Sequence, residues 1–431
     1  MEQKLSPDLP LLQNADLKGR VVLVRVDHNV VKKGDIADPF RIEATIGTLS
    51  HIIEQGGLPV LMTHVGRPRD KKTGNITVSD ATSVAPIVEY LKTKLNISFL
   101  VPECPATEEG IVDPGNTLKD AVERLKRGDV GGVYLPNTRW FAGEETKGEE
   151  RARFAAHLAS LADVYVNDAF GSWQPHASTF DVARLLPSYA GFLMQKELIG
   201  LNAVLNPKRP FVAVVAGAKY DTKIGPVRAL FDRADTLILG GVIYNTYLAA
   251  RYNTGIEGVS DDEKALAREV ISLDEKMGKI LEPRAVTESD VVDERVEGKY
   301  RTVDLDDIHG GGTYHYFLDV APAAFEDPGL KEAIGGAKTI FVNAVMGFAP
   351  HFIDGSRALY DLIDKNRDAM KLFGGGDTLA TFKKVLPDAY RNGIEDDTYY
   401  FFTGGGAVLK VIEEGDPYAL EPVRALMESG K

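Results

Sequence analysis

The sequence predicts an α/β protein of two domains, each built on a mainly parallel sheet, with a hinge helix joining them. Three observations lead to this class. Short runs rich in Val, Leu, Ile and Phe recur along the chain, helical stretches lie between many of them, and glycines or charged residues follow them. Strands that alternate with helices are typical of βαβ units and therefore of parallel sheets. About ten such strands are many for one sheet, so we expect two sheets of about five strands each.

The expected strands divide evenly between the two halves of the chain. In the first half they cover residues 21–26, 58–63, 97–101, 133–136 and 163–167. In the second half they cover residues 210–215, 235–241, 338–343, 371–376 and 399–406. Helices are expected over 41–57 and 81–95, whereas residues 283–325 have a weaker periodicity that supports no firm assignment.

The break between the domains is expected near residues 186–210, where a helical segment ends at Asn206-Pro207. We therefore predict two Rossmann-like domains. The N-terminal domain covers 1–185, the interdomain helix 186–206 and the C-terminal domain 207–415, and a tail over 416–431 returns to the N-terminal domain.

Composition limits the classes of function. The chain has 431 residues, of which 44% are hydrophobic, enough for a packed core. Its one cysteine, Cys104, excludes an internal disulfide and suits a reducing compartment. No apolar run approaches the roughly 20 residues of a membrane span, and the first residues lack the apolar core of a signal peptide. A net charge of −13 argues against nucleic-acid binding. We expect a soluble, cytoplasmic protein whose anion site is a local basic cluster.

Glycines follow several expected strands of the second half. Gly217 ends one strand and precedes Lys219 and Lys223, and further glycines lie at 240–241, 374–376 and 404–406. Such turns let the backbone approach a ligand, and the next helix offers free N–H groups to phosphate. Each cluster alone could be a tight turn that needs a positive φ. Together they favour a nucleotide crevice, although the chain has neither a Walker motif nor a G-x-G-x-x-G fingerprint.

One carboxylate stands beside these glycines. Asp377, followed by Thr378, supplies a hard oxygen ligand of the kind that Mg²⁺ takes near phosphates. The alternative for Asp377 is an ordinary helix N-cap.

Basic and polar residues follow the strands of the first half instead. They are Arg25, Asp27, His28 and Asn29, then His64, Arg67 and Arg69, then Asn137 and Arg139, and finally Asp168 and His176, while Arg41 opens the first long helix. If these loops meet at one sheet edge, they form a pocket for phosphate or carboxylate, which arginine binds through its planar fork. The alternative for any single arginine is a solvated surface charge.

The ordered motifs resemble those of the phosphoglycerate kinase family. The stretches are "RVDHN", "HVGRP", "LPNTRWF", "ADVYVNDAFG", "AGAKYDTKI", "NAVMG", "GGGDT" and "TGGGA", and the resemblance runs from about residue 15 to about residue 425. It implies a cytoplasmic, monomeric kinase of glycolysis with an N-terminal triose-phosphate domain and a C-terminal nucleotide domain. The implied reaction is reversible phosphoryl transfer between ATP and the carboxylate of 3-phosphoglycerate, giving ADP and 1,3-bisphosphoglycerate, with Mg²⁺ and hinge bending.

The resemblance also implies roles for individual residues. Substrate binding would fall to Asp27, Asn29, Arg41, His64, Arg67, Arg139 and His176. Nucleotide binding would fall to Gly217, Lys219, Lys223, Gly240, Gly241, Asn343, Gly374, Gly375, Gly376, Asp377 and Thr378, with Asp377 holding the metal. Arg41, Lys219 and Lys223 would be the catalytic residues. Because the acceptor carboxylate is already ionised at neutral pH, the reaction needs no general base.

Three positions depart from the family pattern. Gln174 and Pro175 stand where the family has an arginine, Pro350 stands near the position of a ribose-binding glutamate, and His28 replaces an aromatic residue. These departures leave an alternative open, a non-catalytic or altered-specificity relative that binds nucleotide or a partner. A purely structural α/β protein is a third alternative.

Overall fold

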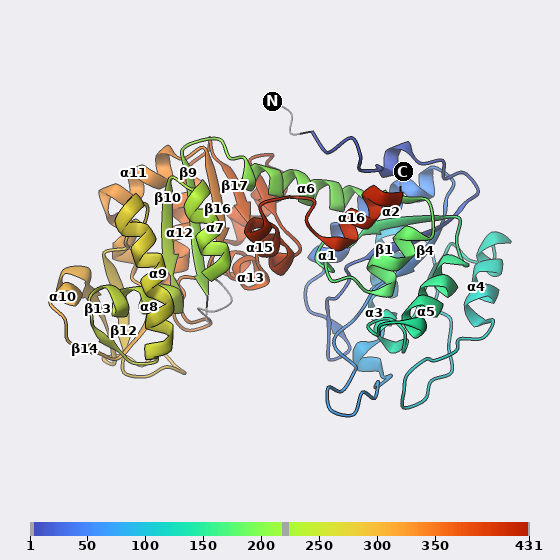
Figure 1. The fold of residues 1–431 in the computed structure, drawn as a ribbon, viewed down its shortest axis with the longest axis horizontal. Coiled ribbons are helices and arrows are strands. Elements are labelled where there is room, and N and C mark those ends of the chain that lie inside the picture. The colour runs from blue at the N-terminus through green and yellow to red at the C-terminus, as the bar shows by residue number, and fades with distance from the viewer. Residues whose placement is uncertain (1–3, 218–223, 430–431) are drawn as a thin grey trace. The chain divides into compact units, whose positions relative to one another are not determined.

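The computed structural model describes residues 4–217 and 224–429 (Figure 1). The chain divides into two compact units. The first comprises residues 1–199 with 418–431, and the second comprises residues 200–417. Within the described ranges, no helix is both long and apolar enough to cross a membrane.

A six-stranded parallel sheet forms the centre of the first unit. Its order is β5 (Phe99–Leu100), β6 (Gly132–Tyr134), β4 (Leu58–Met62), β1 (Val21–Val26), β7 (Val164–Asp168) and β8 (Ser188–Ala190). Every residue of the central strand β1 is buried, because helices and loops cover both faces of a parallel sheet. Parallel strands place all their carboxyl ends at one edge, so the residues after β1, β4, β6 and β7 gather there.

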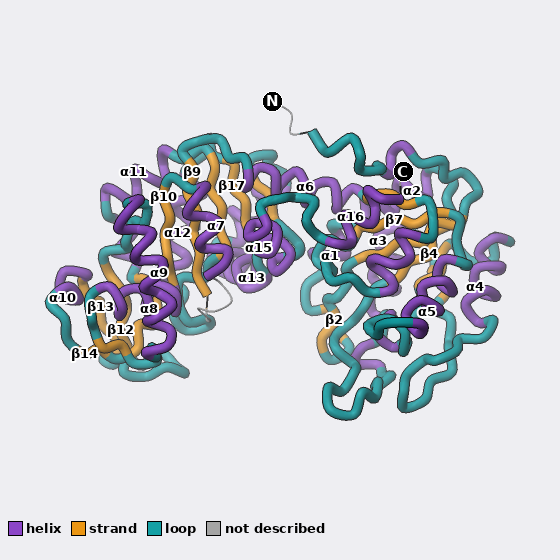
Figure 2. The backbone as a smooth tube through the Cα atoms, in the orientation of Figure 1, coloured by secondary structure: helices purple, strands orange, loops and turns teal. Residues whose placement is uncertain are grey.

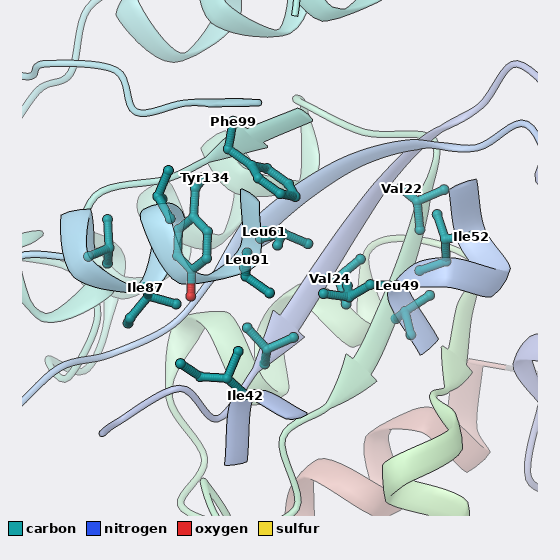
Figure 3. Close-up of a cluster of buried hydrophobic side chains, with 14 of the residues drawn as sticks. Val22, Val24, Ile42, Leu49, Ile52, Leu61, Ile87, Leu91, Phe99 and Tyr134 are labelled. Carbon is teal, nitrogen blue, oxygen red and sulfur yellow. The ribbon is translucent and has the colours of Figure 1, made fainter. Parts of the chain in front are cut away.

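The helices of the first unit pack on this sheet or on each other. They are α1 (Phe40–Glu43), α2 (Ile46–Glu54), α3 (Ala85–Leu95), α4 (Thr117–Lys126), α5 (Glu149–Ala159) and α16 (Glu421–Ser429). Figure 3 shows part of the core, where Val22 and Val24 of β1 lie near Leu49 and Ile52 of α2. Short strands β2 (Val31–Lys32) and β3 (Asp35–Ile36) form a hairpin between β1 and α1.

The helix expected over 41–57 is in fact two helices, α1 and α2, and a buried threonine lies at their junction. The Thr45 hydroxyl donates to the carbonyl of Ile42 at 2.8 Å. Side-chain hydrogen bonds of this kind compete with the helical pattern. Arg41 lies in α1, before this break, and pairs with Asp27 at the carboxyl edge of the sheet.

The segment 186–210 holds a strand followed by a helix. Ser188–Ala190 pair with β7 as β8, and α6 (Phe192–Leu205) begins directly afterwards. The Asp168 carboxylate accepts hydrogen bonds from the N–H groups of Leu193 at 2.9 Å and Met194 at 3.2 Å, which caps the helix. A Cβ at Gly191 would lie 2.2 Å from that carboxylate, so only glycine fits there.

The second unit contains a five-stranded parallel sheet, whose strands are drawn in orange in Figure 2. Its order is β10 (Thr236–Gly240), β9 (Phe211–Gly217), β16 (Thr339–Asn343), β17 (Met370–Phe373) and β18 (Tyr399–Phe401). Its helices are α7 (Ile224–Arg233), α8 (Gly241–Arg251), α9 (Asp261–Met277), α11 (Pro328–Gly336), α12 (Asp354–Lys365), α13 (Gly376–Val385), α14 (Pro387–Ile394) and α15 (Gly405–Glu414). Helices α7 and α8 pack on β9, and α9 packs on both of them.

The region of weak periodicity, 283–325, contains most of the antiparallel structure. Strands β13 (Tyr300–Asp304), β12 (Ala285–Ser289) and β15 (Tyr316–Val320) form a three-stranded sheet beside α10 (Leu305–His309). Strand β11 (Gly255–Ile256), which precedes this region, pairs in parallel with β14 (Thr313–Tyr314). Strand β13 is largely exposed, which explains the lack of a continuous apolar run there. The predicted class, α/β with mainly parallel sheets, is confirmed.

Candidate functional site

The first group of predicted site residues meets at the carboxyl edge of the six-stranded sheet. The register of the sheet places Arg25 beside Met62 of β4 and Asn167 of β7, so the loops that follow these strands are neighbours. We call the following residues the basic cluster: Arg25, Arg41, His64, Arg67, Arg139 and His176. Arg25, Arg41, Arg139 and His176 all act electrostatically on His64, and Arg67 acts on Arg139, so the cluster is contiguous.

Asp27 connects the basic cluster to α1. The Arg41 guanidinium lies 3.1 Å from one oxygen of this buried carboxylate. The other oxygen, Oδ1, is buried and has no hydrogen-bond partner among the described residues. An unpaired buried oxygen is costly, and it is the kind of acceptor that a hydroxyl group of a ligand would satisfy.

Asn29 and Arg139 both hold the loop that follows β4. The Asn29 side chain accepts from the N–H of Gly66 at 2.9 Å, and Arg139 donates to the Gly66 carbonyl at 2.6 Å. Arg139 also lies 2.8 Å from Glu145. Its partial burial lowers the pKa of the guanidinium from the usual value. Arg67 follows Gly66 and is exposed, so it is the cluster member most open to solvent.

The two histidines of the basic cluster are held neutral. Burial and the neighbouring arginines lower the pKa of His64 well below its ordinary value. Burial is also the main cause that lowers the pKa of His176 to about 4, against the opposing effect of Glu145. The positive charge of the cluster at neutral pH therefore comes from its arginines, which suits a multiply charged anion.

The sequence placed Arg25 in the expected basic pocket without a role of its own, and it gave no sign of Glu144, Glu145 and Ser178. Glu144 and Ser178 are fully buried, and Glu145 pairs with Arg139. Arg25 stands at the end of the first expected strand, and that position was the available signal. Nothing in the spacing of Glu144 and Ser178 reveals that they meet.

His28 is a core residue. It is fully buried, and its Nδ1 lies 3.0 Å from the Tyr134 hydroxyl while its Nε2 lies 2.8 Å from Thr45 Oγ1. Burial lowers its pKa to about 3. The Thr45 hydroxyl donates to a carbonyl and so accepts from Nε2–H, which fixes the tautomer.

The segment that lacks the expected arginine lies beside His176. Gln174 is exposed there, and its carbonyl accepts from the Thr179 hydroxyl at 2.7 Å. Arg151 of α5 acts electrostatically on His176 but is paired with Asp181. Arg151 is therefore a cation near the position of the absent arginine, but its charge is paired with the Asp181 carboxylate.

The glycines of the second unit converge at the carboxyl edge of its parallel sheet. Gly217 pairs with Gly241, and the Gly241 N–H donates to the Met346 carbonyl at 3.2 Å. Gly241 has φ +57 and lies so close to Gly217 that a Cβ would come within 3.2 Å of its carbonyl oxygen. A Cβ at Gly240 would meet the Met346 side chain at 2.7 Å. The predicted residues Gly217, Gly240 and Gly241 are thus brought together.

The other glycine loops meet around Asn343. The Asn343 side chain donates to the Gly374 carbonyl at 2.7 Å, and Gly375 has φ +107. A Cβ at Gly405 would lie 2.6 Å from the Gly375 Cα, so the loop before α15 is packed against the loop before α13. The N-termini of α8, α13 and α15 follow strands of the same sheet, and their free N–H groups suit phosphate oxygens.

Asp377 lies exposed in the first turn of α13, while Thr378 beside it is buried. Among the described residues there is no group of three or more His, Cys, Asp or Glu side chains that could hold a metal ion by themselves. A single carboxylate fits Mg²⁺ only if phosphates or water supply the other oxygens, which is how this ion binds with nucleotides.

The position of the absent ribose acid offers no free carboxylate nearby in sequence. Pro350 and His351 are exposed. Asp354, the nearest acid along the chain, lies 2.5 Å from Arg295. Lys219 and Lys223, the predicted phosphate lysines, lie outside the described residues.

Comparisons with known proteins find relatives over nearly the whole chain. A family model described as phosphoglycerate kinase matches residues 12–415. The phosphoglycerate kinase of Roseiflexus castenholzii is 35% identical over 410 residues, covering 93% of this chain and 95% of that protein. The phosphoglycerate kinase of a Thermus thermophilus strain is 34% identical over 417 residues, covering 95% of this chain and 98% of that protein. The structure of the Coxiella burnetii phosphoglycerate kinase matches with a TM-score of 0.76 and 28% identity, covering 98% of this chain and 100% of that one.

Proposed function

The chain belongs to the phosphoglycerate kinase family, and from this premise we propose which of its residues carry the reaction. The protein is a phosphotransferase with a carboxyl group as acceptor, and it transfers a phosphoryl group reversibly between ATP and the carboxylate of 3-phosphoglycerate. Its place is in glycolysis. The alternatives of a non-catalytic relative and a purely structural protein have no support.

The triose phosphate binds at the basic cluster of the first unit. The observation that carries this proposal is the contiguous basic cluster, in which Arg41 pairs with Asp27. Asp27 Oδ1 lacks a partner among the described residues. The arginines supply charge for the phosphate and the carboxylate, and Asp27 accepts a hydrogen bond from the substrate hydroxyl. Asn29 contributes by holding the Gly66 loop in place.

Arg41 is the catalytic member of this cluster. Phosphoryl transfer requires in-line positioning and neutralisation of the equatorial oxygens, with little covalent work by the protein. Arg41 is held by Asp27 at the end of a short helix, and its side chain remains 30% exposed, so it can reach the reacting carboxylate. The acceptor carboxylate is ionised at neutral pH, so no residue is needed as a general base.

The nucleotide binds at the glycine loops of the second unit. The phosphates lie against the N-termini of α8 and α13, with backbone contacts from Gly217, Gly240, Gly241, Gly374, Gly375 and Gly376 and side-chain contacts from Asn343 and Thr378. Lys219 and Lys223 bind the phosphates and share the charge that develops during transfer, a proposal that rests on the family resemblance. Asp377 holds Mg²⁺, which neutralises charge on the nucleotide phosphates.

Two further properties belong to the proposal. The protein acts as a monomer, as the family resemblance implies. It works in the cytoplasm, which the resemblance and the single cysteine both favour. Size-exclusion chromatography with light scattering tests the first of them.

The site division can be tested with arginine variants. Arg67→Ala and Arg139→Ala are each expected to raise the KM for 3-phosphoglycerate by about tenfold or more, since a hydrogen bond to a charged group is worth about 1.5–3 kcal/mol. The KM for ATP should change little. The measurement is a coupled steady-state assay in which each substrate is varied in turn.

Arg20→Ala is the matched control, because Arg20 lies in the same unit but is an exposed arginine paired weakly with Asp16 at 3.8 Å. Its kinetic constants should match those of the unaltered protein. Equal effects of Arg67→Ala on both KM values would contradict the assignment of separate substrate sites.

A further inference from the structure

Arg25 has an unusual environment for an arginine. It is fully buried, although it stands at the edge of the basic cluster. Its Nε donates to Ser178 Oγ at 2.9 Å, and its Nη1 donates to the Val26 carbonyl at 2.5 Å. Its Nη2 lies 3.0 Å from Nδ1 of His64. A guanidinium held on three sides, with no exposed surface, is not placed to contact a substrate directly. Of its three hydrogen-bond partners, only His64 belongs to the basic cluster.

The contact with Arg25 determines the protonation of His64. An arginine can only donate hydrogen bonds, so Nδ1 of His64 must accept and cannot carry a proton. The remaining proton of a neutral imidazole is then on Nε2. The Ser172 hydroxyl lies 3.5 Å from the same Nδ1, too far to compete with the arginine. Nε2 makes no hydrogen bond to any residue in the described part of the chain, so it is available as a donor.

A second pair of residues fixes Arg25. The Ser178 hydroxyl accepts from Arg25 and donates to Glu144 Oε1 at 2.5 Å. The Ser178 N–H donates to the other oxygen of Glu144 at 3.0 Å, and the Ser178 carbonyl accepts from the Tyr165 hydroxyl at 2.9 Å. Every polar group of Ser178 is therefore engaged, which leaves its hydroxyl one orientation.

Glu144 supplies the charge that makes this arrangement stable. It is fully buried, and a buried carboxylate is tolerated only with compensating hydrogen bonds and a nearby cation. The Ser178 hydroxyl lies between the Glu144 carboxylate and the Arg25 guanidinium and hydrogen-bonds to both. Glu144, Ser178, Arg25 and His64 thus form one continuous hydrogen-bonded chain that crosses from the loop after β6 to the loop after β4.

We propose that Glu144, Ser178 and Arg25 are positioning residues that hold His64 in its neutral Nε2–H form, so that it offers one fixed hydrogen-bond donor to the anionic substrate. The inference deepens the proposed function, because it depends on the triose phosphate binding at the basic cluster. Protonation of His64 would direct a second N–H at the Arg25 guanidinium, and Arg25, Arg41, Arg139 and His176 all oppose it. Because His64 stays neutral, the charge of the binding site does not change as the pH varies near neutrality.

The tautomer can be measured without any substrate. In protein labelled with ¹⁵N at histidine, the ring nitrogen shifts distinguish the two neutral tautomers and the charged form. The chain has eight histidines, and the signals of His64 are those that disappear in His64→Gln. We expect the Nε2–H form at pH 7, and a mixture of tautomers in Ser178→Ala and in Glu144→Gln. Ser188→Ala is the matched control, since Ser188 is a buried serine of the same unit whose hydroxyl donates to the Ala183 carbonyl.

Kinetics test the functional half of the proposal. Ser178→Ala and Glu144→Gln should each raise the KM for 3-phosphoglycerate by about tenfold, as expected for a misplaced hydrogen bond to a charged group. The KM for ATP and the pH dependence of kcat/KM for ATP should match those of Ser188→Ala. Glu144→Gln keeps the shape of the side chain, so it serves if Ser178→Ala does not fold.

Distinct results would overturn the inference and the site assignment. A proton on Nδ1 of His64, or a charged His64 at pH 7, would overturn the inference, as would tautomers unaffected by both variants. A third result separates the tautomer from its function. Suppose that Ser178→Ala loses the tautomer and that His64→Gln raises the KM for 3-phosphoglycerate. If Ser178→Ala then leaves that KM unchanged, positioning by Ser178 is refuted. If His64→Gln itself leaves that KM unchanged, the error lies in placing the substrate at His64.

Discussion

A single histidine shows how far residue type alone can mislead. His28 lies between Asp27 and Asn29, two residues assigned to the substrate, and its side chain could have belonged to the site. Its two ring nitrogens are instead bonded to Thr45 and Tyr134, which lie 17 and 106 positions away along the chain. The sequence predicts that a polar residue follows β1, but only the fold brings these two hydroxyl groups to it.

The burial of His28 leads to a prediction about acid stability. Its pKa falls from 6.5 in the unfolded chain to about 3 in the folded one. Between these pH values the unfolded state binds a proton on His28 that the folded state does not. The contribution of neutral His28 to the free energy of unfolding is therefore complete above pH 6.5 and is lost as the pH falls towards 3. From pH 7.5 to pH 5 the unaltered protein should lose about 2 kcal/mol more stability than His28→Phe.

The measurement is urea unfolding of both proteins at the two pH values. Asp168 and Asp319, whose burial raises the pKa of each to about 7, act with the opposite sign. Their contribution to the free energy of unfolding is complete below pH 3.8 and is lost as the pH rises to 7. Because both proteins contain these aspartates, the contribution cancels when the unaltered protein is compared with His28→Phe. Parallel pH dependences of the two proteins would refute the role of His28.

Pro350 supports a second prediction at this scale. It stands near the position where the family has a ribose-binding acid, and Asp354, the next carboxylate along the chain, is paired with Arg295. Nucleotide affinity should therefore come mainly from phosphates and metal. We expect ATP and 2′-deoxyATP to have kcat/KM values within about threefold of each other, where loss of a charged hydrogen bond would cost about tenfold or more.

The comparison requires both nucleotides in one coupled assay, with 3′-deoxyATP as a third substrate. Pro350→Glu should shift the preference towards ATP. Strong discrimination between ATP and 2′-deoxyATP by the unaltered protein would mean that another group holds the ribose.

At the scale of elements, the buried parallel strands were the most predictable part of the fold. Their apolar runs are continuous, and the expected strand over 21–26 coincides with β1. No clear sequence signal marks strands that are antiparallel and half exposed, such as β13, or a side chain that breaks a helix, as Thr45 does. The strand ends that carry the proposed site residues were predictable, but the contacts between loops were not. The closeness of Gly405 to Gly375 is one such contact.

That contact gives a prediction for one helix start. A Cβ at Gly405 would lie 2.6 Å from the Gly375 Cα, a clash with backbone that no side-chain movement relieves. Gly405→Ala should therefore displace the loop before α13, lower the midpoint of thermal unfolding by several degrees, and raise the KM for ATP. A destabilisation of about 1–3 kcal/mol is typical of overpacking in a tight site.

Gly335→Ala is the matched control. Gly335 lies in α11, where a Cβ would have nothing within 4 Å, so alanine should be neutral or stabilising by up to about 1 kcal/mol. Differential scanning calorimetry of both variants gives the comparison. An unchanged unfolding midpoint for Gly405→Ala would mean that the two loops do not need their close approach.

At the scale of the whole molecule, the two proposed sites belong to separate compact units. The basic cluster is built entirely from residues of the first unit, and the glycine loops entirely from residues of the second. Each site sits at the carboxyl edge of its own parallel sheet, where open α/β sheets bind ligands. The residues that follow the expected strands, basic in the first half and glycine in the second, predicted this division, and it suits a small, multiply charged acid and a nucleotide.

Hydrogen exchange provides a test of this division. A ligand that binds the native state slows exchange most where it orders or covers the backbone. 3-Phosphoglycerate alone should therefore slow exchange in residues 27–29, 64–67, 137–139 and 171–176. ATP with Mg²⁺ alone should slow exchange in residues 240–241, 343–347 and 374–378. Mass spectrometry of peptic peptides resolves these segments, and α9 (Asp261–Met277), which carries no predicted site residue, is the internal reference.

In Arg139→Ala the protection by 3-phosphoglycerate should weaken at a fixed ligand concentration, while the protection by ATP with Mg²⁺ persists. Protection of the glycine loops by 3-phosphoglycerate in place of the basic cluster would reverse the assignment of the two sites, and protection of neither set by its ligand would refute it.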